Sequence, residues 1–363
     1  MKKMRKVLAM LFVLILAMTT ITACSSKKDS KVKEASTSSS TDTQSSDATA
    51  ESTDSSDSTA SSAPEDGKTF NIGVCQLVTH EALDAAYKGF VDGLAEAGFE
   101  EGKNVTFDLQ NAQGEPSNCN TIATKLVNDN PDLILAIATP AAQSLANATK
   151  DIPILVTAVT DPATSGIVDT NEAPGGNVTG TSDLTPVQKQ MELLVKLLPD
   201  AKKVAILYCS SEANSQIQAD MANESASTLG LETVTATVSN SNEIQQVVQS
   251  LVGKVDAIYT PTDNTIASGM ATVSMVANAN GIPVICGEEG MVANGGLATY
   301  GINYYNLGKQ TAAQAVKILN GEAKPADMPI EYLEEVSLTI NEEVAAELGI
   351  EIPQDLKDEM NKK

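Results

Sequence analysis

One pattern occurs twice in this sequence: Asp132-Leu133-Ile134-Leu135-Ala136-Ile137-Ala138-Thr139-Pro140 and Val255-Asp256-Ala257-Ile258-Tyr259-Thr260-Pro261. Each apolar run ends in Thr-Pro, and each is followed by a helical pattern and then an Ile-Pro strand start, at Ile152-Pro153 and Ile282-Pro283. A short apolar run of this kind predicts a strand buried on both faces of a parallel sheet. Its repetition predicts two lobes of similar construction.

Both stretches lie within alternating strand and helix patterns. Around the first we expect strands at 70–77, 105–109, 133–138 and 154–159 and helices at 81–97, 121–128 and 141–149. Around the second we expect strands at 204–209, 232–238, 255–259 and 283–286 and helices at 215–229, 243–251 and 265–279. Between the series, Gly180-Thr181-Ser182-Asp183 and a helix at 186–198 indicate a crossover between lobes. The fold class is therefore α/β, with two doubly wound Rossmann-like lobes.

The first residues predict export and a lipid anchor. Four of the first six residues are basic, an unbroken apolar run follows at 7–17, and small residues lead to Cys24. This order is typical of a secretory signal peptide over 1–23, and a cysteine directly after the small residues is typical of a lipoprotein whose thiol is diacylated. The alternative, an uncleaved membrane anchor, needs about 20 apolar residues, more than this run provides.

Residues 24–67 predict a disordered tether. From 35 to 63 the sequence has 18 Ser or Thr in 29 residues, five acids and no Leu, Ile, Val or aromatic residue. Such a segment cannot bury enough apolar surface to offset the entropy lost on folding. Nearly 300 residues follow, a length that suits two domains better than one.

The charge of the chain disfavours some partners. The formal net charge is −23, and removal of residues 1–23, which carry four basic residues and no acid, makes it −27. A strongly acidic chain disfavours nucleic acid and electrostatic adhesion to anionic lipid. We therefore expect no nucleic-acid partner.

The sequence gives little support for a metal, a cofactor or catalysis. Apart from Cys24, the cysteines are Cys75, Cys119, Cys209 and Cys286; none has CxxC spacing, and the chain has one histidine. A zinc site is therefore not expected, and buried free thiols are favoured over a disulfide framework. No GxSxG, Walker or GxGxxG motif is present, so we predict no catalytic residue, no metal and no cofactor.

The Thr-Pro ends of the two strands suggest where a solute binds. Thr is a favourable N-cap and Pro fits the first helical turn, so each helix would present free amides and its positive dipole end above the strand edge. Ligands in open α/β sheets bind outside the carboxyl ends of the strands. We expect Thr139, Pro140 and Ala141 in one lobe and Thr260-Pro261-Thr262 in the other to hold a carboxylate. The alternative is that both are plain caps.

Acids with small polar neighbours occur at the same edges: Thr160-Asp161-Pro162, Thr262-Asp263-Asn264 and Gly287-Glu288-Glu289-Gly290. An acid there can pair with the ammonium group of a zwitterionic solute, although Glu288 could equally occupy a tight turn. His80 could contact the solute or cap the helix that follows it. Tyrosines such as Tyr208 could stack on a flat solute or belong to the core.

Six segments resemble one known family. They are 72–84 (IGVCQLVTHEALD), 111–114 (NAQG), 138–143 (ATPAAQ), 158–162 (AVTDP), 260–264 (TPTDN) and 295–302 (GGLATYGI). They look like the ABC-importer solute-binding lipoproteins whose characterised members bind tryptophan and related aromatic amino acids. The resemblance covers about 70–345 in order.

This resemblance implies a type I periplasmic-binding-protein fold, in which three crossovers form a hinge between the lobes. On this chain the crossovers fall near 182–184, 300–303 and 332–337. The first lobe then comprises 68–183 with 304–333, and the second 184–303 with 334–363. Taken with the residues above, the expected ligand-binding set is Gln76, His80, Glu81, Leu83, Asn111, Ala138, Thr139, Pro140, Ala141, Thr160, Asp161, Tyr208, Thr262, Asp263, Asn264, Glu288 and Asn303.

The chain departs from the family pattern at Asn303. Relatives often carry Asp after Gly-Ile in the Gly-Ile-x-Tyr-Tyr segment. If that acid pairs with an ammonium group in relatives, its replacement weakens the assignment of an amino acid here.

These observations predict an extracytoplasmic, lipid-anchored solute-binding protein of an ABC importer. It would capture an aromatic amino acid by hinge closure and dock on a permease with its ATPase. Two alternatives remain: the same fold binding a sugar, nucleoside or branched-chain amino acid, or a tethered sensor domain. The absence of Trp and the few aromatic residues disfavour a sugar, and a surface enzyme is the least supported hypothesis.

Overall fold

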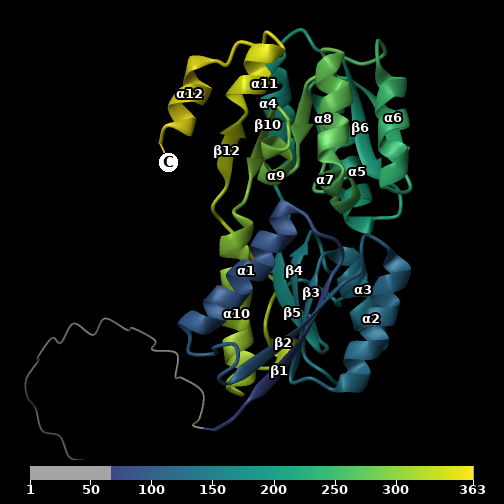
Figure 1. Cartoon of the computed structure of the whole chain (residues 1–363). Helices are drawn as coiled ribbons and strands as arrows, with labels where there is room; N and C mark the ends of the chain where they lie inside the picture. Colours follow the sequence, from purple (N-terminus) through teal and green to yellow (C-terminus); the bar gives the residue numbers. More distant parts are fainter. Residues whose placement is uncertain (1–66, 363) are drawn as a thin grey trace, which may run out of the picture. The chain divides into compact units, whose positions relative to one another are not determined.

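The computed structural model describes Gly67–Lys362, so the predicted signal peptide, Cys24 and all but the last residue of the predicted tether lie outside the described residues. The described part contains two lobes, each built on a six-stranded sheet with helices on both faces (Figure 1). None of the helices in Gly67–Lys362 has the length and apolarity that a membrane span needs.

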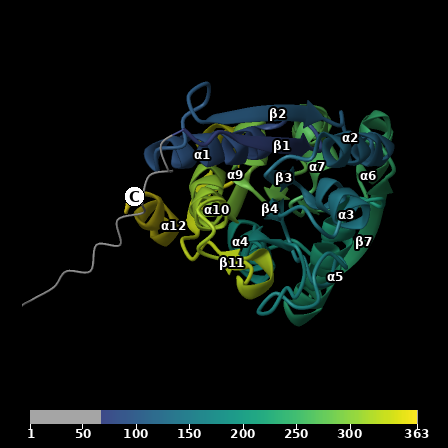
Figure 2. The same ribbon diagram turned by 90° about the horizontal axis from the view of Figure 1, so that it is seen from below.

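The first sheet has the strand order β11-β5-β4-β3-β1-β2, and all its neighbouring strands are parallel. Helices α2 and α3 cover one face, and α1 and α10 cover the other (Figure 2). The elements of this lobe are β1 (Phe70–Gln76), α1 (Glu81–Glu96), β2 (Val105–Asn111), α2 (Pro116–Asp129), β3 (Leu133–Ile137), α3 (Thr139–Ala148), β4 (Ile154–Val159), β5 (Val178–Ser182), α10 (Tyr304–Leu319), the 3-10 helix η2 (Pro325–Asp327) and β11 (Glu331–Tyr332).

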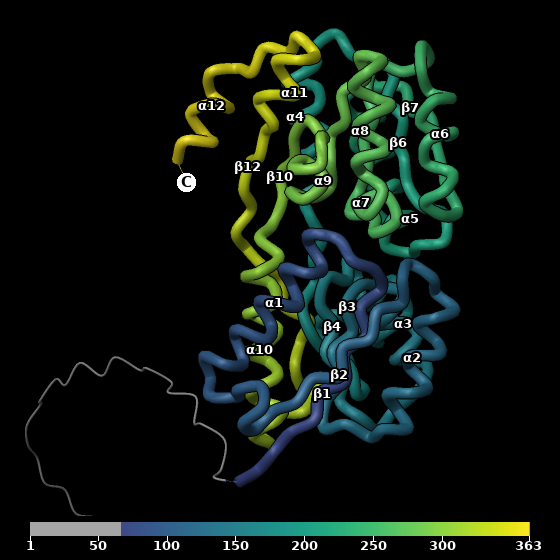
Figure 3. Tube along the Cα trace, in the orientation of Figure 1, coloured from purple at the N-terminus to yellow at the C-terminus, as the bar shows by residue number. Residues whose placement is uncertain are grey.

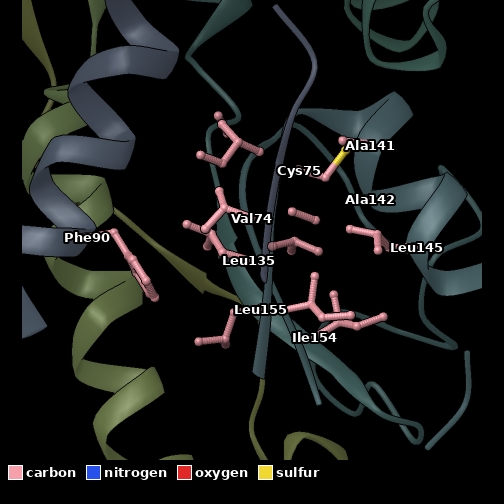
Figure 4. Packing of buried hydrophobic residues seen from close by; sticks show 14 of the residues in the cluster. Val74, Cys75, Phe90, Leu135, Ala141, Ala142, Leu145, Ile154 and Leu155 are labelled. Carbon is pink, nitrogen blue, oxygen red and sulfur yellow. The ribbon is translucent and has the colours of Figure 1, made fainter. Parts of the chain in front are cut away.

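Burial on both faces explains the apolar run that begins the first repeated stretch. Every residue of β3 is buried. Phe90 of α1 lies on one side of the strands, and Ala141 and Leu145 of α3 lie on the other (Figure 4). The prediction of a doubly covered central strand is therefore confirmed.

Helix α10 packs on α1 with a very close approach of the two backbones. A Cβ atom at Gly89 would lie 2.0 Å from the carbonyl oxygen of Tyr305, and one at Gly308 would lie 2.0 Å from that of Ala86. Only glycine permits this approach. The contact joins a segment that follows the second lobe in sequence to the first lobe.

The second sheet has the strand order β12-β10-β9-β8-β6-β7, in which only β12 is antiparallel to its neighbour. Two apolar clusters lie on its two faces, one with α4 and α5 and one with α6 and α8. The elements are α4 (Val187–Leu197), β6 (Lys203–Cys209), α5 (Ala213–Thr228), β7 (Glu232–Val238), η1 (Ser241–Glu243), α6 (Ile244–Leu251), β8 (Ala257–Thr260), α7 (Asn264–Ser268), α8 (Met270–Ala279), β9 (Val284–Cys286), α9 (Glu289–Ala293), β10 (Ala298–Gly301), β12 (Ser337–Ile340), α11 (Glu342–Glu347) and α12 (Gln354–Met360).

The chain passes between the lobes after β5, after β10 and after β11 (Figure 3). Two doubly wound lobes connected in this way have the type I periplasmic-binding-protein fold, which confirms the predicted fold class.

Two predicted helices have other bounds. Helix α2 begins at Pro116 rather than at 121, because proline fits the first turn. The single helix predicted at 265–279 is divided into α7 and α8 at Gly269. A Cβ atom at Gly269 would lie 2.3 Å from Cδ1 of Ile244, so glycine at the break leaves room for the Ile244 side chain.

The four cysteines in the described part are buried and free, as predicted. Within Gly67–Lys362, no group of three or more His, Cys, Asp or Glu residues is arranged to hold a metal ion.

Candidate functional site

A small cavity lies where the carboxyl ends of strands from both lobes meet. The cavity volume is about 10 Å³, which is enough for about one water molecule. A larger solute therefore enters only when the lobes move apart or the lining side chains rearrange. The lining residues are His80, Leu83, Ala158, Thr160, Asp183, Asn214, Thr262, Asp263, Asn264, Ala267, Glu288, Met291 and Tyr304.

Asp183 links two of the crossovers at this cavity. It follows β5, and its Oδ2 accepts a hydrogen bond of 2.8 Å from the hydroxyl of Tyr304, the first residue of α10. Its Oδ1 accepts one of 3.2 Å from the hydroxyl of Thr160. Burial raises the pKa of Asp183 to about 6, because the charged carboxylate loses hydration. The site thus contains an acid that would be stabilised by a cationic group.

Two further buried acids belong to the second lobe and cap its helices. Asp263 caps α7, accepting a hydrogen bond of 2.7 Å from the amide of Ile266, and also accepts one of 2.5 Å from the amide of Cys209. Glu288 caps α9, accepting hydrogen bonds of 2.6 and 2.9 Å from the amides of Gly290 and Met291. Burial raises the pKa of each carboxyl to about 7.

Glu212 holds the segment between β8 and α7 in place. Its carboxylate accepts hydrogen bonds from the backbone and side chain of Asn264, at 3.2 and 2.6 Å, and from the backbone and side chain of Thr265, at 2.9 and 2.8 Å. The side chain of Asn214 donates a fifth, at 3.2 Å. No local motif in the sequence indicates this role.

Two hydrogen bonds cross directly between the lobes at the cavity. Nε2 of His80 lies 3.2 Å from Oδ1 of Asn264. The side-chain amide of Gln218 on α5 donates to the hydroxyl of Thr160 at 3.2 Å and also to the hydroxyl of Thr262. The lobes are therefore in contact here.

The two Thr-Pro segments do not form the predicted helix caps. Helix α3 begins at Thr139 itself; the preceding residue, Ala138, is the N-cap and makes no side-chain cap. Thr260 ends β8, and the next helix begins only at Asn264, capped by Asp263. The prediction was wrong in the first lobe because the helix starts one residue early, which puts Thr139 inside its first turn. It was wrong in the second lobe because the helix starts later, after Asp263, which takes the N-cap position.

The edge of the first lobe also contains strained backbone. Ala138 has φ 80° and ψ 153°, and Ala158, at the end of β4, has φ 54°. Residues with a Cβ rarely adopt positive φ, and such strain concentrates at ligand clamps. The hydroxyl of Thr139 is buried and has no hydrogen-bond partner among the described residues.

The predicted set divides into two groups. Seven of its members line the cavity: His80, Leu83, Thr160, Thr262, Asp263, Asn264 and Glu288. The other ten lie outside its lining: Gln76, Glu81, Asn111, Ala138, Thr139, Pro140, Ala141, Asp161, Tyr208 and Asn303. Whether any of them contacts a solute stays a prediction.

Several members outside the lining have evident structural roles. Asn303 caps α10 by accepting a hydrogen bond of 2.9 Å from the amide of Asn306. Asp161 accepts hydrogen bonds in the turn that follows β4. Gln76 donates to Asp84 at 2.6 Å, and the hydroxyl of Tyr208 donates to Gln216 at 3.0 Å.

The remaining members lie close to lobe edges. Asn111 ends β2 and accepts a hydrogen bond of 2.8 Å from the amide of Gln113. Glu81 begins α1 and faces α9, since a Cβ atom at Gly290 would lie 3.1 Å from its Cβ. Pro140 and Ala141 are buried in the first turn of α3.

Sequence reasoning missed six lining residues: Ala158, Asp183, Asn214, Ala267, Met291 and Tyr304. A usable signal existed for Asp183, which directly follows a buried strand, much as Asp161 follows β4 after Thr160. Because β5 is Val-Thr-Gly-Thr-Ser rather than an apolar run, its pattern predicts a crossover and not a strand end at a site.

Two α/β lobes that meet over a small polar cavity define a two-lobed solute-binding protein. The sequence model of the family described as ABC transporter substrate binding protein matches residues 71–363, and the chain belongs to this family. This confirms the resemblance found in the sequence.

Individual relatives agree with this assignment. The chain is 46% identical over 284 residues to a tyrosine-binding protein of Clostridioides difficile (strain R20291), covering 78% of this chain and 82% of that protein. It is 43% identical to an ABC domain from Streptococcus pneumonia solved in complex with L-Trp, with a TM-score of 0.78 and coverage of 80% and 98% of the two chains.

A third comparison describes the lobe arrangement. The ligand-free, open structure of a substrate-binding protein with adhesive properties from Clostridium difficile is 48% identical and covers 79% of this chain and 97% of its own, yet its TM-score is 0.62. The L-Trp complex is less similar in sequence but superimposes better. Together with the small cavity, this indicates that the lobes of the present structure are closed.

Proposed function

We propose that this chain is the lipid-anchored, extracytoplasmic solute-binding protein of an ABC importer, and that it binds an aromatic amino acid between its lobes. The observation that carries the proposal is the interlobe cavity, to which both lobes contribute polar side chains. The tyrosine-binding relative and the L-Trp complex support the choice of solute.

The polar groups suit the two ends of an amino acid. The hydroxyl groups of Thr160 and Tyr304 each donate to one oxygen of Asp183, and a carboxylate has about four acceptor positions, so capacity is left for an ammonium group. Thr139 and the uncapped amino end of α3 supply hydrogen-bond donors for a carboxylate. Leu83, Ala267 and Met291 form an apolar part of the lining against which a ring can pack.

Binding then follows from closure of the lobes. In an open form, water hydrates the acids at the lobe edges; on closure, the ammonium group of the solute replaces that hydration at Asp183. A solute shifts the equilibrium towards the closed form only by contacting both lobes. No bond of the solute is made or broken, and the closed protein docks on the permease.

Calorimetric titration tests the solute. The full-length chain is titrated with tyrosine, tryptophan and phenylalanine, with leucine and glucose for comparison. We expect heat with an aromatic amino acid, and a loss of roughly 10- to 100-fold in affinity for Asp183→Asn, which removes a charge-assisted hydrogen bond. Asp151→Asn, an exposed acid of the first lobe outside both the predicted set and the cavity lining, is the control and should retain affinity. No heat with any of the three aromatic amino acids contradicts the proposal.

A separate experiment tests the lipid anchor. In cells, the protein should partition into the membrane fraction and carry a diacylglyceryl mass at Cys24. Cys24→Ala should abolish the modification and prevent processing. A water-soluble chain that retains residues 1–23 contradicts the anchor.

A further inference from the structure

The cavity contains a histidine whose two ring nitrogens have different surroundings. Nε2 of His80 faces Oδ1 of Asn264 at 3.2 Å, whereas Nδ1 is buried and has no hydrogen-bond partner among the described residues. His80 lines the cavity, and since Nε2 is already engaged, Nδ1 is the ring nitrogen that a solute can still bond.

The orientation of the Asn264 side chain is set by Glu212. Nδ2 of Asn264 donates to Oε2 of Glu212 at 2.6 Å. Glu212 accepts five hydrogen bonds in total, and the backbone amides of Asn264 and Thr265, which can only donate, occupy Oε2 and Oε1 as acceptors. Nδ2 must therefore face Glu212, and Oδ1 must face His80.

This orientation fixes the protonation of the imidazole ring. Oδ1 of Asn264 can only accept, so Nε2 of His80 carries the hydrogen atom. Burial lowers the pKa of His80, which keeps the ring neutral. In a neutral ring with a proton on Nε2, Nδ1 is an acceptor.

We propose that Glu212, acting through Asn264, holds His80 in its Nε2–H form, so that Nδ1 of His80 selects solutes that present a hydrogen-bond donor beside their aromatic ring. The phenol hydroxyl of tyrosine and the indole N–H of tryptophan are such donors, and phenylalanine has none. A solute without the donor leaves Nδ1 buried and unpaired, which a hydrogen-bonding site rejects strongly. The selectivity rests on the proposed function, whereas the state of the ring does not.

The first experiment needs no solute. His80 is the only histidine in the chain, so ¹⁵N-histidine labelling of the full-length protein, prepared without a histidine tag, gives the signals of one ring. We expect a neutral Nε2–H ring at pH 7. A neutral Nδ1–H ring or an imidazolium in the unliganded wild-type protein overturns the proposal.

The second experiment measures selectivity. In the wild-type protein, tyrosine or tryptophan should bind about 10- to 100-fold more tightly than phenylalanine, and only the donor-bearing solute should shift the Nδ1 resonance. Glu212→Gln places an amide donor near Asn264 and should weaken binding of tyrosine or tryptophan more than that of phenylalanine, which reduces the preference to a few-fold. A merely structural role would weaken all three solutes equally, and that result overturns the proposal.

Two more variants keep the test valid if Glu212→Gln does not fold. Asn264→Ala removes the acceptor for Nε2 and should also lose the preference. Thr265→Val removes one hydrogen bond to Glu212 without touching the Asn264 side chain, and should keep both the Nε2–H ring and the preference. Loss of the preference in Thr265→Val would overturn the proposal that Glu212 acts on His80 through Asn264.

The outcomes separate the two proposals. If the wild-type protein binds none of the three aromatic amino acids, the proposed function fails, whatever the ring state. If it binds all three equally and the Nε2–H ring is present, the proposed function stands and the selective role of His80 is overturned.

Discussion

The two lobes are built alike, but they begin their cavity-side helices differently. In the second lobe, Asp263 and Glu288 occupy the amino ends of α7 and α9 and take up their amides. In the first lobe, the N-cap residues of α1 and α3 are His80 and Ala138, and neither makes a side-chain cap. The amino ends of α7 and α9 are therefore occupied by acids of their own segments, whereas those of α1 and α3 are not capped by a side chain.

Two lobes with similar strand order can therefore differ in the groups that they offer a solute. In the second lobe, Asp263 and Glu288 are held in place by hydrogen bonds from the backbone amides of α7 and α9. The first lobe keeps uncapped amides, a free Thr139 hydroxyl and the positive-φ residues Ala138 and Ala158. Uncapped helix ends and strained backbone persist where a ligand uses them, so we assign the anionic end of the solute to the first lobe.

The largest expected effect comes from uncapping the second lobe. Asp263→Ala removes the cap of α7 and leaves the amide of Cys209 without its partner. We expect a loss of about 3 kcal/mol in the free energy of unfolding, measured by urea denaturation. Asp263→Asn keeps one acceptor oxygen and should lose less than half as much. A loss below about 1 kcal/mol for the alanine variant would show that the cap contributes little.

The second effect concerns pH and the acid at the first-lobe edge. In the folded chain the pKa of Asp183 is about 6, above its ordinary value of 3.8. At a pH between these two values, Asp183 keeps its proton in the folded chain and loses it in the unfolded chain. The contribution of this proton to the free energy of unfolding is fully present below about pH 4 and is lost as the pH rises through 6. Asp183→Asn should therefore reduce the fall in unfolding free energy between pH 5 and pH 8 by about 1.5 kcal/mol.

Urea denaturation at several pH values measures this difference. Asp263 and Glu288, with pKa values raised to about 7, give a fall of the same sign that should remain in the variant. If the wild-type and variant profiles are parallel, Asp183 does not titrate differently in the folded and unfolded chains.

The third effect compares two equivalent threonines. Thr139 and Thr260 both precede proline, and both hydroxyls are buried without a partner among the described residues. Only Thr139 begins a helix, whereas Thr260 ends β8. We expect Thr139→Val to weaken solute binding about 10-fold in calorimetry and Thr260→Val to leave it unchanged. Equal effects would remove the distinction between the lobes.

The smallest effect concerns the strained backbone. Ala138→Gly should relieve positive-φ strain and, after the added chain entropy of glycine, raise the unfolding free energy by up to about 1 kcal/mol. Thermal denaturation measures this change. A lower melting temperature would show that the Ala138 conformation is not strained.

The sequence predicted the repeated strand-helix order well, because buried parallel strands such as β3 are continuous apolar runs between helices with clear periodicity. It also predicted seven residues of the cavity lining, since polar residues at strand ends converge on one edge. It did not predict Glu212 or Gln218, which act on residues far from them in the chain. It misplaced the caps because local preferences of Thr and Pro cannot show which of several nearby residues will win the N-cap position.

The packing of α10 against α1 through Gly89 and Gly308 has a consequence for how the protein is made. Strands β1 to β5 are synthesised early, but the helix that covers one of their faces emerges only after most of the second lobe. The first lobe therefore stays incomplete, with apolar surface uncovered, until synthesis has passed residue 319. Such long-range closure slows folding and prolongs the time in which an unfinished chain can aggregate or be kept unfolded by chaperones.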